Sequence, residues 1–262
     1  MPETKNTFDS ISTKYDLINN LISLGGHKRW KHEFVNLLEI NGRVLDIATG
    51  TGDIAILIQK MHPSTSIIGI DPSHEMLEIA KNKSPKKISF VQGFCEDLPF
   101  EDGAFNYITI SFGIRNVVSI EKSLNEINRT LSEDGHLLIM EFSKNSSLFI
   151  KFLYKVYLNF FIPMVGFLFG KYQEYKYLAS SIESFFTMDE MNNIISNHGF
   201  KITKNLKFNF GLVTVYVAKK TKAWMYLTFH LGKLWQSKGL DNSGVQLKLG
   251  KLISLYIFLF AP

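Results

Sequence analysis

The sequence lacks the marks of several large protein classes. It holds a single cysteine, Cys95, which excludes an internal disulfide and favours a reducing compartment. No run of about eighteen uncharged apolar residues occurs, so we expect no conventional membrane-spanning helix. The seven histidines and the 24 acidic residues show no metal-ligand spacing, so we expect no metal. The first residues are polar and mixed in charge, and we therefore expect no signal peptide.

The chain also has little net charge outside its last segment. Residues 221–262, called the tail below, hold five lysines and one acid, a net of +4 out of the total of +5. The remaining +1 gives no reason to expect a nucleic-acid partner. In the tail, Trp224, Leu227 and Leu231 recur at helical spacing among the lysines, and basic plus aromatic residues favour an anionic membrane surface. A disordered extension that packs against nothing is the alternative.

The rest of the chain is organised around residues 44–53, where an apolar segment containing Asp46 leads into a turn with Gly50 and Gly52. A buried strand, a Gly-x-Gly turn and a helix N-terminus make a nucleoside-binding corner, because glycines allow close approach and free N–H groups face the ligand. The turn also matches the dinucleotide fingerprint, with Asp71 about twenty residues further on. Asp46 would repel a pyrophosphate but attract the ammonium group of S-adenosylmethionine. The stretch favours this methyl donor, and an ordinary glycine-rich turn is the alternative.

Buried strands alternate with helical segments through residues 1–220, which predicts right-handed crossovers and a mostly parallel sheet. Five strands are expected at residues 44–48, 66–71, 88–92, 105–111 and 136–142. Two further strands, at residues 200–206 and 211–218, are expected to close the sheet as a hairpin, which gives seven strands in total. A helical lid is expected over residues 1–40, and an aromatic helical insertion over residues 146–182.

Local signals set several element boundaries. Ser73 is expected to cap a helix that ends near residue 81. Leu131 is expected to continue the apolar stripe of the helix before it, and residues 134–135 to form a turn into the fifth strand. Pro163 and Gly166 are expected to interrupt the insertion.

Five sequence blocks, in the same order, resemble the ubiquinone/menaquinone biosynthesis C-methyltransferase family over about residues 8–220. The blocks are residues 15–23 with the following His27 and Trp30, residues 98–100, residues 108–116, residues 141–144 and residues 175–182. The resemblance implies an α/β, Rossmann-like class I S-adenosylmethionine-dependent methyltransferase fold. It makes residues 1–220 the methyltransferase domain and residues 221–262 a basic, aromatic C-terminal extension.

The expected cofactor-binding residues come from the glycine-rich corner and from the resemblance. They are Asp46, Gly50, Thr51, Gly52, Asp71, Phe94, Cys95 and Ser111. Asp46 is expected to face the donor's ammonium group, and Asp71 to accept both ribose hydroxyls, with helix capping as its alternative. Phe94 stands where family members usually have an Asp or Asn that recognises adenine, which leaves backbone contacts and stacking. Cys95 is expected to be a small buried residue, and Tyr216, where many members have His, is given no role.

Methyl transfer to carbon is an in-line displacement, so the enzyme supplies positioning and an electron-rich carbon. A hydroquinone ring carbon becomes nucleophilic when a ring hydroxyl loses its proton. Arg115, after the fourth strand, is the expected anion stabiliser, with Asn116 as its hydrogen-bonding partner; a simple ion pair with an acid is the alternative. Arginine does not lose its proton, so it is not the expected base. Tyr15, Asp16 and His27 are open candidates for lid packing, donor closure or the base.

Together these features predict C-methylation of a demethylated polyprenyl quinol, a demethylmenaquinol or a ubiquinol precursor, with S-adenosylmethionine as cofactor. The alternatives are a methyltransferase of another lipid or phenol, a non-catalytic nucleotide-binding module of a quinone-biosynthesis assembly, and an NAD-dependent oxidoreductase. The expected partners are the quinol and a membrane surface, and a homodimer is left open. The expected location is the cytoplasm, peripherally at the inner face of the membrane.

Overall fold

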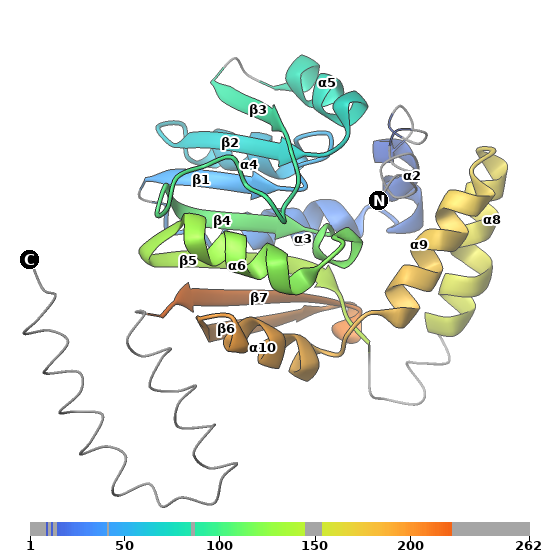
Figure 1. Cartoon of the computed structure of the whole chain (residues 1–262). Coiled ribbons are helices and arrows are strands. Elements are labelled where there is room, and N and C mark those ends of the chain that lie inside the picture. Colours follow the sequence, from blue (N-terminus) through green and yellow to red (C-terminus); the bar gives the residue numbers. More distant parts are fainter. Residues whose placement is uncertain are drawn as a thin grey trace, which may run out of the picture. The chain divides into compact units, whose positions relative to one another are not determined.

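The computed structural model describes Asp9, Ser12 and residues 15–40, 42–84, 87–144 and 154–221. Within this part, seven strands form one sheet in the order β3-β2-β1-β4-β5-β7-β6 (Figure 1). The strands are β1 (Arg43–Ile47), β2 (Ser66–Asp71), β3 (Ile88–Gln92), β4 (Phe105–Ser111), β5 (Leu131–Phe142), β6 (Phe200–Phe208) and β7 (Val213–Lys220). β1 to β5 pair in parallel, and β7 lies antiparallel between β5 and β6. The predicted sheet and its closing hairpin are confirmed.

Alternate residues of the central strands face opposite helical layers. Val44 on β1 packs with α3 (Gly26–Val35) and α4 (Asp53–Met61), whereas the next residue, Leu45, packs with α6 (Ile120–Thr130) and α10 (Met188–Asn197). A parallel strand covered on both faces needs a nearly continuous apolar run. In β1 the apolar run is interrupted by Asp46. Because this acid is buried, it needs hydrogen-bond donors near the end of the strand.

The boundaries of the helices follow most of the local signals. The hydroxyl of Ser73 accepts the backbone N–H of Met76 and caps α5 (His74–Lys83), as predicted. The predicted place of Leu131 on a helical stripe is wrong, because α6 ends at Thr130 and Leu131 already pairs with Phe105 in β5.

The predicted turn at residues 134–135 lies within β5 and takes the form of an irregularity in its pairing. The pairing of β5 with β4 jumps from Leu131 to His136, and Asp134 adopts a φ of 62° between them. Residues 132–135 of β5 thus lie opposite one residue of β4, which is a larger irregularity than a bulge with one extra residue.

The insertion forms a helical hairpin. Its elements are a π-helical turn at Tyr157–Phe161, α8 (Ile162–Leu168) and α9 (Tyr172–Ser184). The predicted interruption at Pro163 and Gly166 is wrong, because residues 154–168 are helical throughout. Pro163 lies two residues after the π-helical turn, where the backbone hydrogen-bond pattern changes and a missing N–H is accommodated. Gly166 is needed for packing instead, since a Cβ there would lie 2.7 Å from the Cβ of Tyr175.

The predicted lid and the insertion lie at the same end of the sheet. Figure 1 shows α2 (Tyr15–Ile22) beside α8 and α9 there. Ile18 of α2, Ile162 of α8 and Ile182 of α9 belong to one buried apolar cluster. Of the predicted lid, residues 1–8, 10, 11, 13 and 14 lie outside the described residues, as does the whole tail beyond residue 221. Of the helices that the structure describes, none combines the length and the apolar character needed to cross a bilayer.

Candidate active site

Two cavities adjoin at the carboxyl ends of β1, β2 and β4. The first, between the sheet edge, α2, α3 and α9, measures about 1140 Å³ with its solvent-open space, and the second, beside β2 and β3, about 960 Å³. Six residues line both cavities: Tyr15, Ala48, Gly50, Ser111, Phe112 and Asn116. Ligands of open α/β sheets bind at this edge. The shared lining means that a molecule in one cavity can touch a molecule in the other.

Asp71, at the end of β2, holds the floor of the second cavity. Its two carboxylate oxygens accept the backbone N–H of Gly50 and of Ser73, each at 2.9 Å. Burial raises the pKa of this carboxyl to about 6, while the two backbone bonds oppose the rise. Asp71 therefore joins the glycine-rich turn to the start of α5. The bond to Ser73 agrees with the capping alternative, and the ribose contact stays a prediction.

Asp46 lies under the first cavity and is almost fully buried. The hydroxyls of Thr49 and Thr109 donate to its two oxygens at 2.6 Å and 2.8 Å. Burial raises the pKa of Asp46 to about 6, against these hydrogen bonds. Each carboxylate oxygen has a second lone pair, so the group can still accept from an ammonium group above it. A cation bound there would restore the ionised form.

The two glycines of the turn serve different purposes. Gly50 has a φ of 54° and nothing within 4 Å of the place where a Cβ would stand, and it lines both cavities. Gly52 lines neither cavity, unlike the other predicted cofactor residues. It has a φ of 82°, and a Cβ there would lie 3.0 Å from Ala80 and 3.3 Å from Phe90. Gly50 thus leaves room for a ligand, whereas Gly52 allows α4 to pack closely against α5.

Two residues that are not glycine hold left-handed backbone at the junction of the cavities. Ala48 follows β1 with a φ of 52°, and Phe112 follows β4 with a φ of 57°. The loops are packed together so closely that a Cβ on Gly113 would lie 2.4 Å from the Cβ of Ala48. Such backbone costs roughly 1–3 kcal/mol per residue and concentrates at functional sites. The close packing of the two loops therefore holds Ala48 and Phe112 in these unfavourable backbone conformations.

The remaining predicted cofactor residues divide between the cavities. Phe94 and Cys95 line the second cavity, Thr51 lines the first, and Ser111 lines both. The ring of Phe94 is partly exposed at the cavity, which suits stacking on a flat base. Burial raises the pKa of Cys95 to about 12, so its thiol stays protonated and unreactive, as predicted for a small buried residue.

Arg115 is buried in an ion pair that the sequence analysis did not assign. Its Nη1 lies 2.5 Å from Oε1 of Glu141, and only 5% of the arginine side chain and none of the glutamate side chain is exposed. Nη1 also donates to the carbonyl of Phe112 at 3.0 Å, and the guanidinium lies over the ring of Phe142. Burial raises the pKa of Glu141, and the adjacent arginine opposes this. The charge of Arg115 is therefore balanced before any substrate enters.

Asn116 lies next to Arg115 on a short 3-10 helix (Ile114–Asn116) and lines both cavities. Its Oδ1 accepts the hydroxyl of Tyr177, on α9, at 3.3 Å. This contact links α9 of the insertion to the loop after β4. Asn116 therefore touches both cavities and the insertion.

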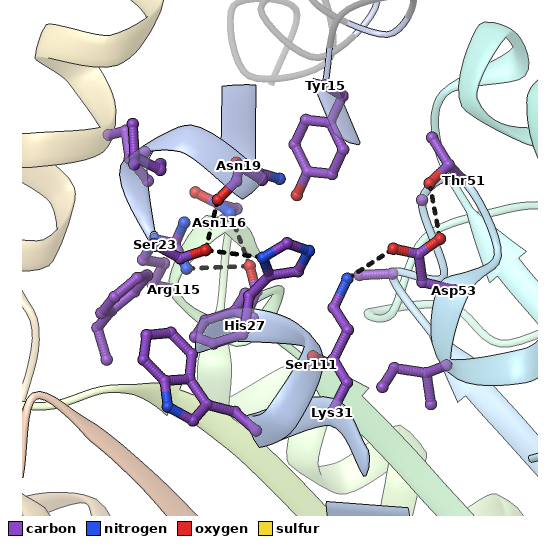
Figure 2. A pocket seen from close by; sticks show the side chains of 18 of the residues that line it. Tyr15, Asn19, Ser23, His27, Lys31, Thr51, Asp53, Ser111, Arg115 and Asn116 are labelled. Atoms are coloured by element: carbon purple, nitrogen blue, oxygen red, sulfur yellow. Dashed lines mark hydrogen bonds and ion pairs between the residues drawn. The ribbon is translucent and has the colours of Figure 1, made fainter. Parts of the chain in front are cut away.

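One wall of the first cavity comes from α2, α3 and the turn between them. Figure 2 shows Tyr15, Asn19, Ser23 and His27 along this wall. The hydroxyl of Ser23 lies 2.6 Å from the carbonyl of Asn19 and 2.7 Å from Nδ1 of His27. Burial raises the pKa of the Tyr15 phenol, with Arg115 opposing, so Tyr15 stays protonated at neutral pH. Of the three open candidates, Tyr15 and His27 face the cavity.

Asp16, the third candidate, belongs to a chain of charges beside the glycine-rich turn. Lys83 lies 2.7 Å from Asp16 and 2.8 Å from Asp53. Lys31 lies 2.7 Å from Asp53, and Figure 2 shows this pair. The hydroxyl of Thr51 donates to Asp16 at 2.9 Å. Burial opposes it, but the lysines lower the pKa of Asp53 to about 2. These ion pairs join α2 and α3 to α4 and α5 beside the glycine-rich turn.

Three residues of the site, Lys31, Ser23 and Glu141, were not predicted from the sequence. Lys31 lies four residues after His27 on the same face of α3, so its spacing was readable once His27 was a candidate. Ser23 lies in the turn between α2 and α3, and its contact with His27 follows from the path of that turn. Glu141 is a fully buried acid in an otherwise apolar strand, and such a residue needs a cation beside it. Which cation lies beside Glu141 depends on the packing of β4 against β5, because Arg115 follows β4 and Glu141 lies on β5.

The sheet order, the strand-end carboxylates and the glycine-rich corner define the class: a Rossmann-like S-adenosylmethionine-dependent methyltransferase. A solved methyltransferase of this kind from Thermotoga maritima superposes with a TM-score of 0.61 at 20% identity, covering 84% of this chain and 100% of that one. A methyltransferase in complex with its Trm112 activator, from Haloferax volcanii, gives a TM-score of 0.62 at 13% identity and covers 82% and 98%. At such identities the likeness shows the fold alone.

Sequence comparison defines the family. Residues 2–220 match the ubiE/COQ5 methyltransferase family, and the chain belongs to it. A ubiquinone/menaquinone biosynthesis C-methyltransferase UbiE from Geotalea uraniireducens is 41% identical over 221 residues, which cover 81% of this chain and 94% of that protein. A demethylmenaquinone methyltransferase from Thermotoga maritima is 40% identical over 200 residues, covering 75% and 87%. S-adenosylmethionine is thus the cofactor of the site, and the oxidoreductase alternative is set aside.

Proposed function

We propose that this chain transfers the methyl group of S-adenosylmethionine to a ring carbon of a demethylated polyprenyl quinol. Relatives that cover most of the chain are named for quinone biosynthesis. The observation that carries the proposal is the junction of the two cavities, where six residues line both. A donor in the second cavity can then present its methyl group to a ring in the first without passing through solvent.

The donor-side residues suit a cation with a nucleoside. Asp71, Phe94 and Cys95 would hold the ribose and the base in the second cavity, and Asp46 would face the ammonium group. The donor supplies an electrophilic methyl group when it is bound. The residues of this chain hold the donor and the ring in line. Such positioning accounts for a large part of the lowering of the activation barrier in displacements of this kind.

The first cavity suits an aromatic ring with hydroxyl groups. Phe112 and Phe142 offer ring faces, and Arg115 and Asn116 offer hydrogen bonds beside them. Because Glu141 balances the charge of Arg115, the guanidinium adds directed N–H groups and no net charge. We therefore assign Arg115 to binding and stabilising the oxygen of the ring as its proton leaves.

Anaerobic assay of the purified chain tests the reaction. With S-adenosylmethionine and a short-chain demethylated naphthoquinol or benzoquinol, we expect a product with the new methyl group on carbon, located by NMR, and one S-adenosylhomocysteine per turnover. Methylation on oxygen, or of unrelated phenols only, would favour the alternative methyltransferase. Tight donor binding without any turnover would favour a non-catalytic module.

A polyprenyl substrate requires contact with a membrane, and we propose that α8 provides it. Phe160, Met164 and Phe167 recur at helical spacing and are 72%, 54% and 70% exposed. Large contiguous apolar surfaces of this kind are rare on proteins without a binding partner. Tyr157 and Ile162, on the same helical segment, line the first cavity. A prenyl chain could then run from the cavity along α8 into the lipid, with the chain bound peripherally at the cytoplasmic face.

The tail is a second candidate for this contact, and vesicle co-sedimentation separates the two. Truncation after Lys220 removes a net charge of +4, and each basic residue near an anionic surface contributes about 1 kcal/mol. If the tail binds, truncation weakens binding to anionic vesicles and reduces its salt dependence. If α8 binds, Phe160→Ser with Phe167→Ser weakens binding at any salt concentration. Phe210→Ser, at an exposed phenylalanine between β6 and β7 and so outside the helical insertion, does not weaken it. A change of oligomeric state in the α8 variant instead would assign this face to a homodimer.

A further inference from the structure

The Ser23 hydroxyl fixes the tautomer of His27. A hydroxyl has one proton, and a carbonyl oxygen can only accept. Because Ser23 Oγ lies 2.6 Å from the carbonyl of Asn19, its proton must point to that carbonyl. The contact of 2.7 Å with His27 is then an Nδ1–H bond donated to the Ser23 oxygen. Nε2 of His27 consequently carries a lone pair.

This lone pair faces the first cavity. Figure 2 shows the imidazole with Nδ1 toward Ser23 and the opposite side of the ring toward the open centre of the cavity. Among the described residues, none forms a hydrogen bond with Nε2. Burial and the nearby Lys31 lower the pKa of His27 to about 4, with Lys28 acting in the same direction and Asp53 and Asp16 against it. The ring is thus neutral at neutral pH, and the lone pair on Nε2 is not already protonated.

The other basic groups that line this cavity are already engaged. Asp46 accepts two threonine hydroxyls and lies where the donor's cation is expected. Asp53 is held by Lys31 and Lys83, and Glu174 lies 3.5 Å from Lys171. Arg115 cannot accept a proton. Among the described residues that line the first cavity, His27 is the proton acceptor whose acting atom, Nε2, carries no proton and has no hydrogen-bond partner.

We infer that His27 Nε2 is the general base that takes the proton of the quinol's ring hydroxyl, and that Ser23 and the carbonyl of Asn19 position it. The inference rests on the proposed function and names the residue that starts its chemistry. As the hydroxyl proton moves to Nε2, the ring carbon forms its bond to the methyl group. The donor's S–C bond breaks, and its electron pair stays on sulfur. The ring carbon then loses its hydrogen to solvent as a proton, aromaticity returns, and His27 gives its proton back to the oxygen, so that one proton is released per turnover.

The pH dependence of single-turnover methyl transfer tests this role. With His27 as base, the wild-type rate should be nearly independent of pH between about pH 6 and 9, because the neutral quinol is deprotonated in the site. His27→Gln should be slower by about 10²–10⁴-fold at neutral pH. Its rate should rise about tenfold per pH unit, since only quinol that has already ionised can then react. A quinol with a more acidic hydroxyl should recover part of the loss.

Matched variants separate this role from a structural one. Ser23→Ala should lower the rate by about tenfold, less than His27→Gln, because the base remains but its tautomer is no longer fixed. His32→Gln, on the same helix but exposed and bonded only to Asn36, should leave the rate unchanged. All three variants should bind S-adenosylmethionine like the wild type in calorimetry. In the free protein, ¹⁵N NMR of histidine should show Nδ1 protonated and Nε2 unprotonated for His27.

The outcomes distinguish this inference from the proposed function. If the wild type does not methylate the quinol, the proposed function fails and the inference fails with it. If the wild type is active but His27→Gln keeps its rate, or loses rate equally at every pH, His27 is not the base although the function stands. A protonated Nε2 in the NMR spectrum would also overturn the inference.

Discussion

The second cavity and the first cavity are built in different ways. The second uses strand ends that follow one another in the chain, with the glycine-rich turn, Asp71 and residues 94–95 in sequence order. The first gathers side chains from α2, α3, the loop after β4, and α9, which are distant in sequence. A methyl-donor site can therefore be a local motif, whereas an acceptor site here is a product of tertiary packing. This difference predicts how each cavity responds to substitution.

The largest expected effect is in the first cavity. Glu141→Ala should lower the free energy of unfolding by about 3–5 kcal/mol, because it leaves the buried Arg115 charged and unpaired. Arg115→Ala should cost less, since burial raises the pKa of Glu141 and this carboxyl can take up a proton instead. Urea denaturation at neutral pH measures both.

The same pair has a pH signature. In Arg115→Ala the folded-state pKa of Glu141 lies above its unfolded value, so folding favours the protonated form. The variant should approach wild-type stability as the pH falls and lose stability as the pH rises. Equal costs for the two substitutions at every pH would show that the pair contributes packing and no charge. In either case Arg115→Ala should lower turnover with little change in donor affinity.

The next effect concerns the second cavity. Asp71→Ala should weaken S-adenosylmethionine binding at least tenfold, because hydrogen bonds to an ionised group contribute roughly 1.5–3 kcal/mol each. The substitution also frees the N–H groups of Gly50 and Ser73, so the turn itself loosens. Calorimetry measures the affinity, and the control is Asp97→Ala in the neighbouring loop, which lines neither cavity. Unchanged binding would leave Asp71 with only its structural contacts.

An effect of comparable size follows from the carboxylates of both cavities. Burial raises the pKa of Asp46 and of Asp71 to about 6. A cationic donor prefers both in the ionised form, so its affinity should be constant at higher pH and fall as the pH decreases through about 6. The loss approaches tenfold per pH unit for each group that must ionise. Calorimetric titrations from about pH 8 to about pH 5 follow the change. An affinity that rises on acidification would contradict these assignments.

The smallest effect is expected for the ion pairs that join α2 and α3 to α4 and α5. Lys83 is about a third exposed, and partly exposed ion pairs contribute about 0–1 kcal/mol. Lys83→Met should therefore change donor affinity by less than about fivefold and mainly speed donor release in stopped-flow experiments. High salt should have a similar effect on the wild type and little on the variant. If salt acts equally on both, this ion-pair chain does not control donor release.

The sequence predicted the second cavity well because its signals are local. Three of the seven strands, β2, β3 and β4, have the predicted bounds, and Ser73 caps α5 as expected. Gly50 and Asp71 lie where the motif puts them, although Gly52 turned out to serve packing. The irregular β5 pairing and the unbroken helix through Pro163 were missed, because both depend on neighbours that local propensity does not contain.

The first cavity was predicted only in part. Arg115 and Asn116 were identified from one block after β4, but the partner of Arg115 comes from β5 and the partner of Asn116 from α9. No local pattern contains those pairings. The candidates on α2 and α3 could not be ranked from sequence, because only the folded helices reveal that Ser23 and Asn19 set the tautomer of His27.

The reaction assigned to this chain is the addition of a methyl group to the ring of a polyprenyl quinol. Mass spectrometry of the quinones from cells that lack the gene is the direct test of this reaction. We predict accumulation of a quinone, or of its biosynthetic precursor, that is one ring methyl group lighter, with the normal quinone restored by the wild-type gene and not by the Arg115→Ala form. A normal quinone profile in cells that have no second enzyme of this family would contradict this assignment.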